Sequence, residues 1–87
     1  MRVNRVLIYT SAICPYCVAA KNFLVGRGLA YEEVRIDLDA AQRDQMIRLT
    51  NRRSVPQIFI NDHHVGGYDD MVALDRAGGL NALLNKD

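Results

Sequence analysis

The stretch Val6-Leu7-Ile8-Tyr9-Thr10-Ser11-Ala12-Ile13-Cys14-Pro15-Tyr16-Cys17 decides the fold of this chain. Its first four residues form a short, continuous apolar run of the kind found in strands that are buried on both faces. Pro15 suits the first position of a helix, so Cys14 is expected to stand where that helix begins. The stretch therefore predicts a strand, a short loop and a helix that opens with two cysteines.

The remaining elements follow from turn and cap signals along the chain. In chain order we expect a strand at 6–9, a helix from 14 to a Gly28 cap, a strand at 31–36, a helix at 39–51 capped by Asp39, a hairpin at 56–65 that turns at Asn61-Asp62, a helix that starts at 69–70, and a short amphipathic turn at 80–84. The first strand–helix–strand unit implies parallel strands with a right-handed crossover, and the hairpin adds antiparallel strands. The sequence predicts an α/β fold with a four-stranded mixed sheet and helices on both faces, as a single domain over residues 1–87.

Composition excludes several classes of protein. The 87 residues carry 11 basic and 10 acidic side chains, for a net charge of +1, which does not resemble a nucleic-acid-binding face. Apolar runs are far shorter than the roughly 20 residues of a membrane helix. The start, Met1-Arg2-Val3-Asn4-Arg5, has no signal-peptide pattern. We expect a protein of the reducing cytoplasm without a membrane or nucleic-acid partner.

The two cysteines are the candidate reactive groups. They lie three residues apart, so a disulfide between them would close a very short loop and add little stability. A helix N-terminus stabilises a thiolate, which favours Cys14 as the nucleophile. Cys17 lies on the inward stripe of the helix and is expected to be the less exposed, resolving thiol. The alternative is a pair of unrelated buried cysteines.

A metal site is not expected at these cysteines. Tetrahedral zinc needs four ligands, and the chain has no second Cys-x-x-Cys pair. His63 and His64 are neighbours on a strand, so their side chains point to opposite faces. We interpret them as ordinary hairpin residues.

Three motifs resemble those of the glutaredoxin family. Cys14-Pro15-Tyr16-Cys17 matches the active-site motif of dithiol glutaredoxins, Ser54-Val55-Pro56 is similar to the family's Thr-Val-Pro segment, and Gly66-Gly67-Tyr68-Asp69-Asp70 is similar to its Gly-Gly-x-(Ser/Asp)-Asp segment. Their order and spacing match over nearly the whole chain, in particular those of the short bacterial glutaredoxins. The resemblance implies a thioredoxin-like fold and an enzyme that uses glutathione as co-substrate, with no tightly bound cofactor.

The resemblance also implies a glutathione site. Pro56 would be a cis-proline that faces the cysteines and exposes the Val55 backbone to an extended thiol peptide. Gly67 would allow close backbone approach, and the helix start at 68–70 would meet the γ-glutamyl carboxylate, with an aspartate for the ammonium. The residues expected to contact glutathione are Tyr16, Arg53, Ser54, Val55, Pro56, Gly67, Tyr68, Asp69 and Asp70.

Two positions depart from the family pattern. Ser11 stands where many relatives have a lysine, so the cation for the glycine carboxylate of glutathione must come from elsewhere. Arg53 is our first candidate, and Arg52 and Arg48 are further ones. Tyr68 replaces a common Cys or Ser, which narrows the groove or adds a stacking surface. These departures leave the substrate preference open.

The predicted function is glutathione-dependent reduction of protein–glutathione mixed disulfides and protein disulfides by a monomer. Two alternatives stay open. One is a dimer that holds a [2Fe–2S] cluster through two Cys14 thiolates and two glutathiones, since such clusters need four thiolates. The other is a thioredoxin-type protein reduced directly by a reductase, which Tyr16 and the 66–70 segment disfavour.

Overall fold

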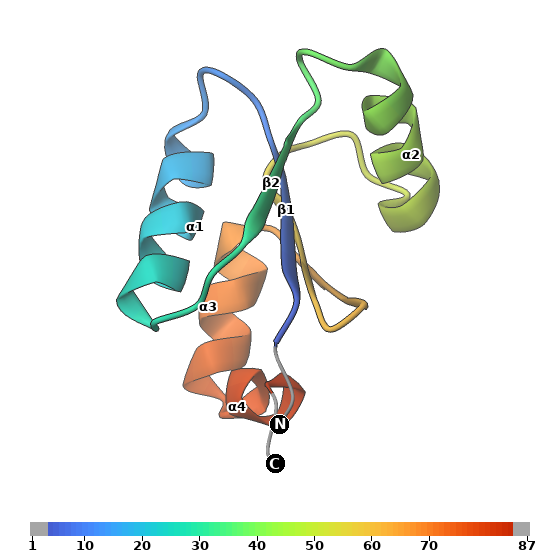
Figure 1. Cartoon of the computed structure of the whole chain (residues 1–87). Helices are drawn as coiled ribbons and strands as arrows, with labels where there is room; N and C mark the ends of the chain where they lie inside the picture. The colour runs from blue at the N-terminus through green and yellow to red at the C-terminus, as the bar shows by residue number, and fades with distance from the viewer. Residues whose placement is uncertain (1–3, 85–87) are drawn as a thin grey trace.

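One mixed sheet organises the computed structural model, which describes residues 4–84. Its strand order is β2-β1-β3-β4 (Figure 1). The central strand β1 (Val6–Thr10) pairs in parallel with β2 (Glu32–Arg35) and antiparallel with β3 (Gln57–Ile60). β3 continues through a tight turn into β4 (His63–Gly66), its antiparallel neighbour. The predicted mixed sheet is confirmed, whereas Met1–Val3 of the N-terminal stretch lie outside the described residues.

Helices cover both faces of this sheet, as predicted. α1 (Pro15–Gly26) and α3 (Tyr68–Arg76) lie together on one face, and α2 (Ala40–Thr50) lies on the other (Figure 1). The short α4 (Gly79–Leu83) follows α3. Within residues 4–84, none of these helices has the length and apolar character that crossing a bilayer requires.

The helix boundaries follow from local capping chemistry. Cys14 is the N-cap of α1 with Pro15 in the first turn, and Gly28 follows the helix with φ at +71°. The Asp39 carboxylate caps α2 by accepting from the backbone N–H of Ala41 at 3.0 Å. α2 ends where Asn51 adopts a left-handed conformation. These predicted helix ends are confirmed.

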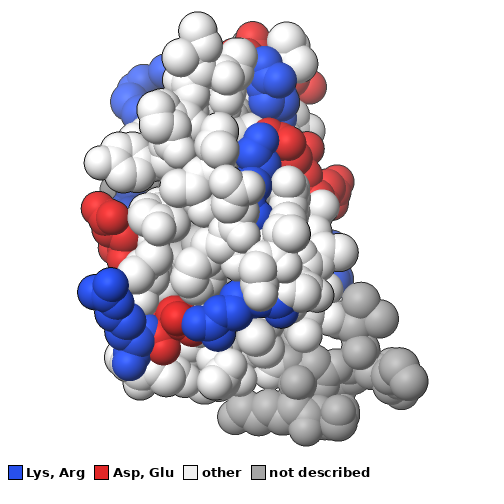
Figure 2. Space-filling model, turned by 90° about the vertical axis from the view of Figure 1, so that its left-hand side faces the viewer, with Lys and Arg blue, Asp and Glu red and all other residues white. Residues whose placement is uncertain are grey.

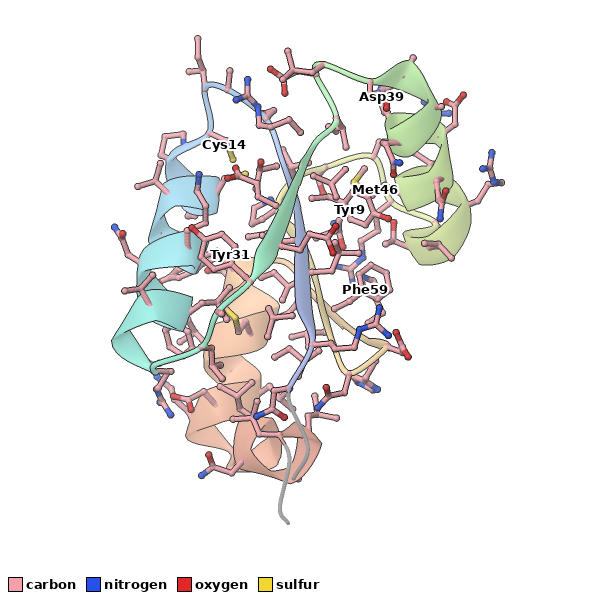
Figure 3. All side chains as sticks on the ribbon, in the orientation of Figure 1. Tyr9, Cys14, Tyr31, Asp39, Met46 and Phe59 are labelled. Carbon is pink, nitrogen blue, oxygen red and sulfur yellow. The ribbon has the colours of Figure 1, made fainter. Side chains whose placement is uncertain are left out.

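Alternation along the strands divides the core in two. Val6, Ile8, Ala20, Leu24, Ile58, Ile60, Met71 and Leu80 form the buried cluster between the sheet, α1 and α3. Tyr9 and Met46 lie in a second cluster under α2, where the Tyr9 ring meets the edge of Phe59 (Figure 3). Burying each large aliphatic side chain contributes about 1.5–3 kcal/mol. Both clusters fix β1, and therefore the loop that leads from it to Cys14.

Charged side chains are interspersed on the face that α1 and α3 form. Figure 2 shows small groups of opposite sign on this side, with wide uncharged areas between them. The ion pair between Arg27 and Asp75 links α1 to α3 there. An interspersed surface of this kind creates no extended field of one sign on this face.

Candidate active site

Cys14 lies at one end of the sheet, where the chain leaves β1 and α1 begins (Figure 3). As the N-cap residue, it turns its sulfur toward the helix, and this Sγ accepts a hydrogen bond from the backbone N–H of Cys17 at 3.1 Å. The same sulfur lies 3.8 Å from the carbonyl oxygen of Val55. The Val55–Pro56 peptide bond is cis, as the resemblance implied. The fold thus brings Cys14 against the segment around Pro56.

Cys17 is one turn further along α1 and has the opposite environment. Its residue surface is 1% exposed, and burial together with the hydrogen bond to Cys14 raises the pKa of its thiol to about 12. The backbone of Ser11 and the positive charge of Lys21 act in the other direction on this pKa. Cys17 is therefore a buried, protonated thiol beside a more accessible one.

A small groove lies between the Ser54–Pro56 segment and the start of α3. It has a volume of about 290 Å³ and is lined by Tyr16, Arg52, Ser54, Val55, Pro56, Gly67, Tyr68, Asp69 and Asp70. Eight of the nine residues expected to contact glutathione are in this lining. A larger pocket of about 510 Å³, lined in part by Leu7, Tyr31 and Phe59, contains neither cysteine. Cys14 lines neither pocket, but its sulfur adjoins the smaller groove, because it lies 3.8 Å from the carbonyl oxygen of Val55, which lines that groove.

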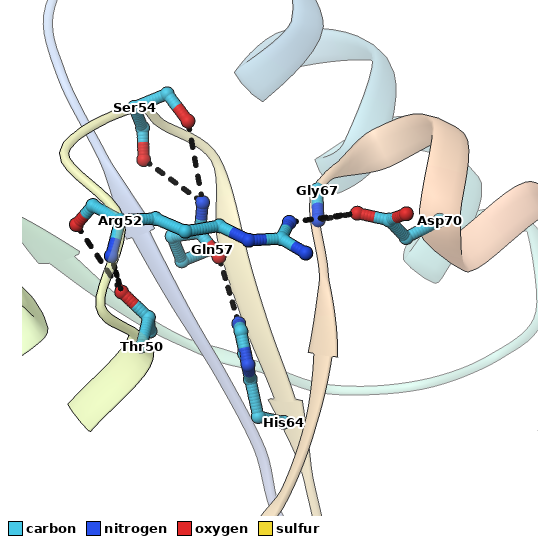
Figure 4. Close-up of polar contacts among 7 residues, drawn as sticks. All are labelled: Thr50, Arg52, Ser54, Gln57, His64, Gly67 and Asp70. Atoms are coloured by element: carbon cyan, nitrogen blue, oxygen red, sulfur yellow. Dashed lines mark hydrogen bonds and ion pairs between the residues drawn. The ribbon is translucent and has the colours of Figure 1, made fainter.

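Arg52, and not Arg53, is the arginine that reaches the groove. Its Nη1 lies 2.9 Å from Oδ2 of Asp70 (Figure 4). Both arginines are exposed, but Arg53 is absent from the groove lining. The reason is local: Asn51 turns the chain with a left-handed conformation, and the Arg52 N–H then donates to the Thr50 hydroxyl at 3.0 Å. The sequence carried no signal that distinguishes these neighbouring arginines.

Asp70 organises the other end of the groove. Its Oδ2 accepts the backbone N–H of Gly67 at 2.9 Å, and this hydrogen bond, with that from Arg52, holds the pKa of the carboxyl below its usual value. Asp69 also lines the groove, and within residues 4–84 its carboxylate forms no ion pair. Asp70 is thus a structural anion, while the exposed Asp69 is available to a ligand.

Two tyrosines form an aromatic wall on the groove. The rings of Tyr16 and Tyr68 lie 6.2 Å apart between centroids, tilted by 38°. Tyr16 is 61% exposed, so the wall faces solvent. Tyr68 therefore adds aromatic surface to the groove, one of the two outcomes expected from the sequence.

Gly66 has a structural role that the sequence analysis missed. Its φ is +116°, and a Cβ there would lie 2.4 Å from Asp70 Oδ2, closer than atoms can approach. Gly67, the glycine singled out from the sequence, has φ near −86°, and a Cβ on it would lie 3.5 Å from the Pro56 carbonyl oxygen, an ordinary contact. The Gly-Gly pair just before a predicted helix was the available signal for such a constraint.

Comparison with known proteins identifies the family to which this chain belongs. A family model described as Glutaredoxin matches residues 6–65. The chain belongs to the glutaredoxin family. It is 51% identical over 77 residues to glutaredoxin 3 of Escherichia coli K12, covering 88% of this chain and 93% of that protein. It is 46% identical over 80 residues to a glutaredoxin of Pseudomonas aeruginosa, covering 92% and 95% respectively. The chain is therefore a glutaredoxin-type thiol oxidoreductase.

Solved glutaredoxin structures share the fold. A dithiolic glutaredoxin from Trypanosoma brucei brucei matches with a TM-score of 0.84 at 33% identity, over 94% of this chain and 88% of that one. Buckwheat glutaredoxin, solved as a complex with glutathione, also has a TM-score of 0.84, at 27% identity over 93% and 76%. The predicted thioredoxin-like fold is confirmed.

Proposed function

We propose that this glutaredoxin reduces protein–glutathione mixed disulfides and protein disulfides with glutathione as co-substrate, through Cys14 and Cys17. The observation that carries the proposal is the position of the Cys14 sulfur, at a helix N-terminus and 3.8 Å from the Val55 carbonyl oxygen at the edge of the groove. A helix N-terminus favours the thiolate form, which is the attacking species.

The groove has chemical groups for each part of glutathione. The Val55 backbone is available to an extended thiol peptide, because Val55 lies before β3 and within residues 4–84 its N–H makes no hydrogen bond. The first-turn amides of α3 suit the γ-glutamyl carboxylate, and Asp69 suits the ammonium. We assign the glycine carboxylate to Arg52, in place of Arg53.

The monothiol route uses Cys14 alone. Its thiolate attacks the glutathionyl sulfur of a mixed disulfide, a new S–S bond forms between Cys14 and glutathione, and the substrate thiolate leaves and takes a proton. A second glutathione thiolate then attacks the glutathionyl sulfur on Cys14. Glutathione disulfide leaves and the Cys14 thiolate is restored, stabilised by the Cys17 N–H at 3.1 Å.

The dithiol route adds Cys17. When Cys14 attacks a protein disulfide, the mixed disulfide links Cys14 to the substrate, and Cys17 must lose its proton to attack Cys14. The product is a Cys14–Cys17 disulfide and a reduced substrate, and two glutathiones then reduce the enzyme. Because burial raises the pKa of Cys17 to about 12, this thiol must give up its proton as it attacks, and the substrate thiolate that leaves Cys14 takes up a proton.

The remaining expectations are also proposals. We infer a single-domain monomer that acts in a reducing compartment and binds no cofactor tightly. The alternative of a glutathione-ligated [2Fe–2S] dimer stays a separate prediction, which absorbance in the visible range after anaerobic reconstitution tests.

The decisive experiment compares two electron sources for the same substrate. Turnover of a glutathionylated peptide is followed with glutathione plus glutathione reductase, and separately with thioredoxin reductase. We expect turnover with glutathione that saturates with substrate and is abolished in Cys14→Ser. Turnover only with thioredoxin reductase would overturn the proposal.

A further inference from the structure

A chain of hydrogen bonds connects β4 to the segment that faces Cys14. Nε2 of His64 lies 2.8 Å from Oε1 of Gln57, and Nε2 of Gln57 donates to the Ser54 carbonyl oxygen at 3.1 Å (Figure 4). The same amide nitrogen lies 3.4 Å from the Ser54 hydroxyl. Gln57 is 1% exposed, so its amide depends on these protein partners. His64 thus reaches Ser54, two residues before Pro56, through one buried amide.

The donors and acceptors in this chain have one consistent assignment. The Gln57 amide nitrogen faces two oxygens of Ser54, so its Oε1 is the atom that faces His64 and can only accept. The imidazole must therefore carry a proton on Nε2. Burial and the charge of Arg52 lower the pKa of His64, His63 acts in the same direction, and Asp70 opposes them. At neutral pH the ring is therefore neutral, and its one proton is the one shared with Gln57.

The imidazole is also held mechanically. Its ring packs against Phe59 with 5.0 Å between centroids. A register shift in the β3–β4 pairing between Ile58 and Phe59 accompanies the diagonal reach of His64 back to Gln57. The ring is therefore oriented by packing on its face and by a hydrogen bond on its edge.

We propose that His64, acting through Gln57, is a positioning residue that holds the Ser54–Pro56 segment in the geometry that binds glutathione. It does so as the neutral tautomer protonated on Nε2. This inference rests on the proposed glutathione function. It assigns to His64 a role beyond that of an ordinary hairpin residue, which is how the sequence alone was interpreted.

The expected consequence is a selective loss of substrate binding. Without the imidazole N–H, Oε1 of Gln57 is buried and unpaired, which favours rotation of the amide and releases the Ser54 carbonyl. The Val55 backbone then loses its fixed position in the groove. Cys14 keeps its cap position on α1, where its sulfur accepts the Cys17 N–H, and it meets the Ser54–Pro56 segment only at the Val55 carbonyl oxygen, 3.8 Å away. The Michaelis constant for the glutathionylated substrate should therefore rise while kcat is little changed.

The test compares His64→Phe with His64→Gln. Phenylalanine keeps the ring against Phe59 but removes the donor, whereas the glutamine amide nitrogen can reach the position of the imidazole Nε2. With a glutathionylated peptide as substrate, we expect His64→Phe to raise KM about three- to tenfold and change kcat by less than about twofold. His64→Gln should restore KM to within about twofold of the wild type. The control, His63→Phe, alters an exposed neighbour and should leave KM unchanged.

Two further measurements test the role of His64 even if His64→Phe does not fold or the proposed function is wrong. Long-range 1H–15N NMR should show the Nε2–H tautomer of His64 at neutral pH. Gln57→Glu keeps an acceptor for His64 but loses the donor to Ser54, so it should raise KM as His64→Phe does. It also provides the test if His64→Phe does not fold. An Nδ1–H tautomer, an unchanged KM in both variants, or a His64→Gln variant as impaired as His64→Phe would overturn the inference. A wild-type protein that shows no glutathione-dependent turnover would instead overturn the proposed function.

Discussion

The sulfur of Cys14 accepts a hydrogen bond from the backbone N–H of Cys17 at 3.1 Å. This backbone contact acts on the Cys14 sulfur, whereas the Cys17 thiol responds to burial and to a separate side-chain contact with Cys14. For Cys14 it supplies a donor to the sulfur, and a donor to an ionised acceptor is about twice as strong as one between neutral groups. For Cys17, proximity to Cys14 adds to burial in raising the thiol pKa. The asymmetry between nucleophile and resolving thiol therefore has a structural cause.

Selective alkylation should report this asymmetry. With limiting iodoacetamide at pH 7, we expect Cys14 to be modified at least about tenfold faster than Cys17, because a buried thiol with a pKa of about 12 is almost entirely protonated. Peptide mass spectrometry of the reduced protein measures both rates. Comparable labelling of the two residues would contradict the assignment.

Substitution of Cys17 should separate the two routes. Cys17→Ser removes the internal resolving thiol and leaves Cys14 in its cap position, since the backbone N–H that contacts its sulfur is unchanged. We expect activity on a glutathionylated peptide to be retained and most activity on a protein disulfide to be lost. The two substrates are assayed side by side with the same enzyme preparation. Loss of both activities together would show that the division of roles is wrong.

Substitutions of the neighbouring residues Arg52 and Arg53 test which arginine binds the glycine carboxylate of glutathione. Arg52→Ala should raise the Michaelis constant for glutathione about two- to tenfold with kcat little changed, because the contact binds ground and transition state alike. Arg53→Ala removes the same charge one residue away from the groove lining and should leave the constant unchanged. Added salt should reduce the effect of Arg52→Ala. The reverse pattern would restore the sequence-based choice of Arg53.

Acid should weaken the Asp70 contacts in a defined direction. The Gly67 N–H and Arg52 lower the pKa of Asp70 in the folded state, so its contribution to stability is complete above the unfolded pKa of about 3.9 and is lost as the pH falls through the lower folded value. The side chains of Arg52 and Asp70 are each 48% exposed, so we expect only about 0.5 kcal/mol from this ion pair. Asp70→Asn should cost about that amount in urea unfolding at pH 7 and nothing near pH 2. An equal difference at both pH values would contradict this account.

Much of the fold could be predicted because its signals are local. Pro15 after Cys14, Asp39 before α2 and the Asn61-Asp62 turn each act through their own backbone, and the turn residues have φ values of 50° and 68°. Such cap and turn preferences do not depend on distant parts of the chain. The element order followed from these signals.

The parts of the site that could not be predicted depend on a loop without a sequence pattern and on contacts between different strands. The choice between Arg52 and Arg53 depends on how the chain turns after α2, and no periodic pattern covers that loop. The contact of His64 with Gln57 joins side chains of two strands, beside a register shift between β3 and β4. Strand alternation predicts that the side chains of His63 and His64 point to opposite faces, but it does not predict which residues either side chain contacts.

Gly66 provides a stability test of the turn that leads into α3. Gly66→Ala would place a Cβ in a backbone conformation with φ at +116° and against the Asp70 carboxylate, so it must move the residue that Gly67 and Arg52 both contact. We expect a loss of about 2–4 kcal/mol in the free energy of unfolding, combining backbone strain with displacement of the carboxylate. Gly67→Ala is the matched control, because its φ is ordinary and its Cβ has room, and it should change this free energy by less than about 1 kcal/mol. Urea unfolding of both variants at pH 7 makes the comparison, and a Gly66→Ala protein as stable as Gly67→Ala would show that the turn can relax without Asp70.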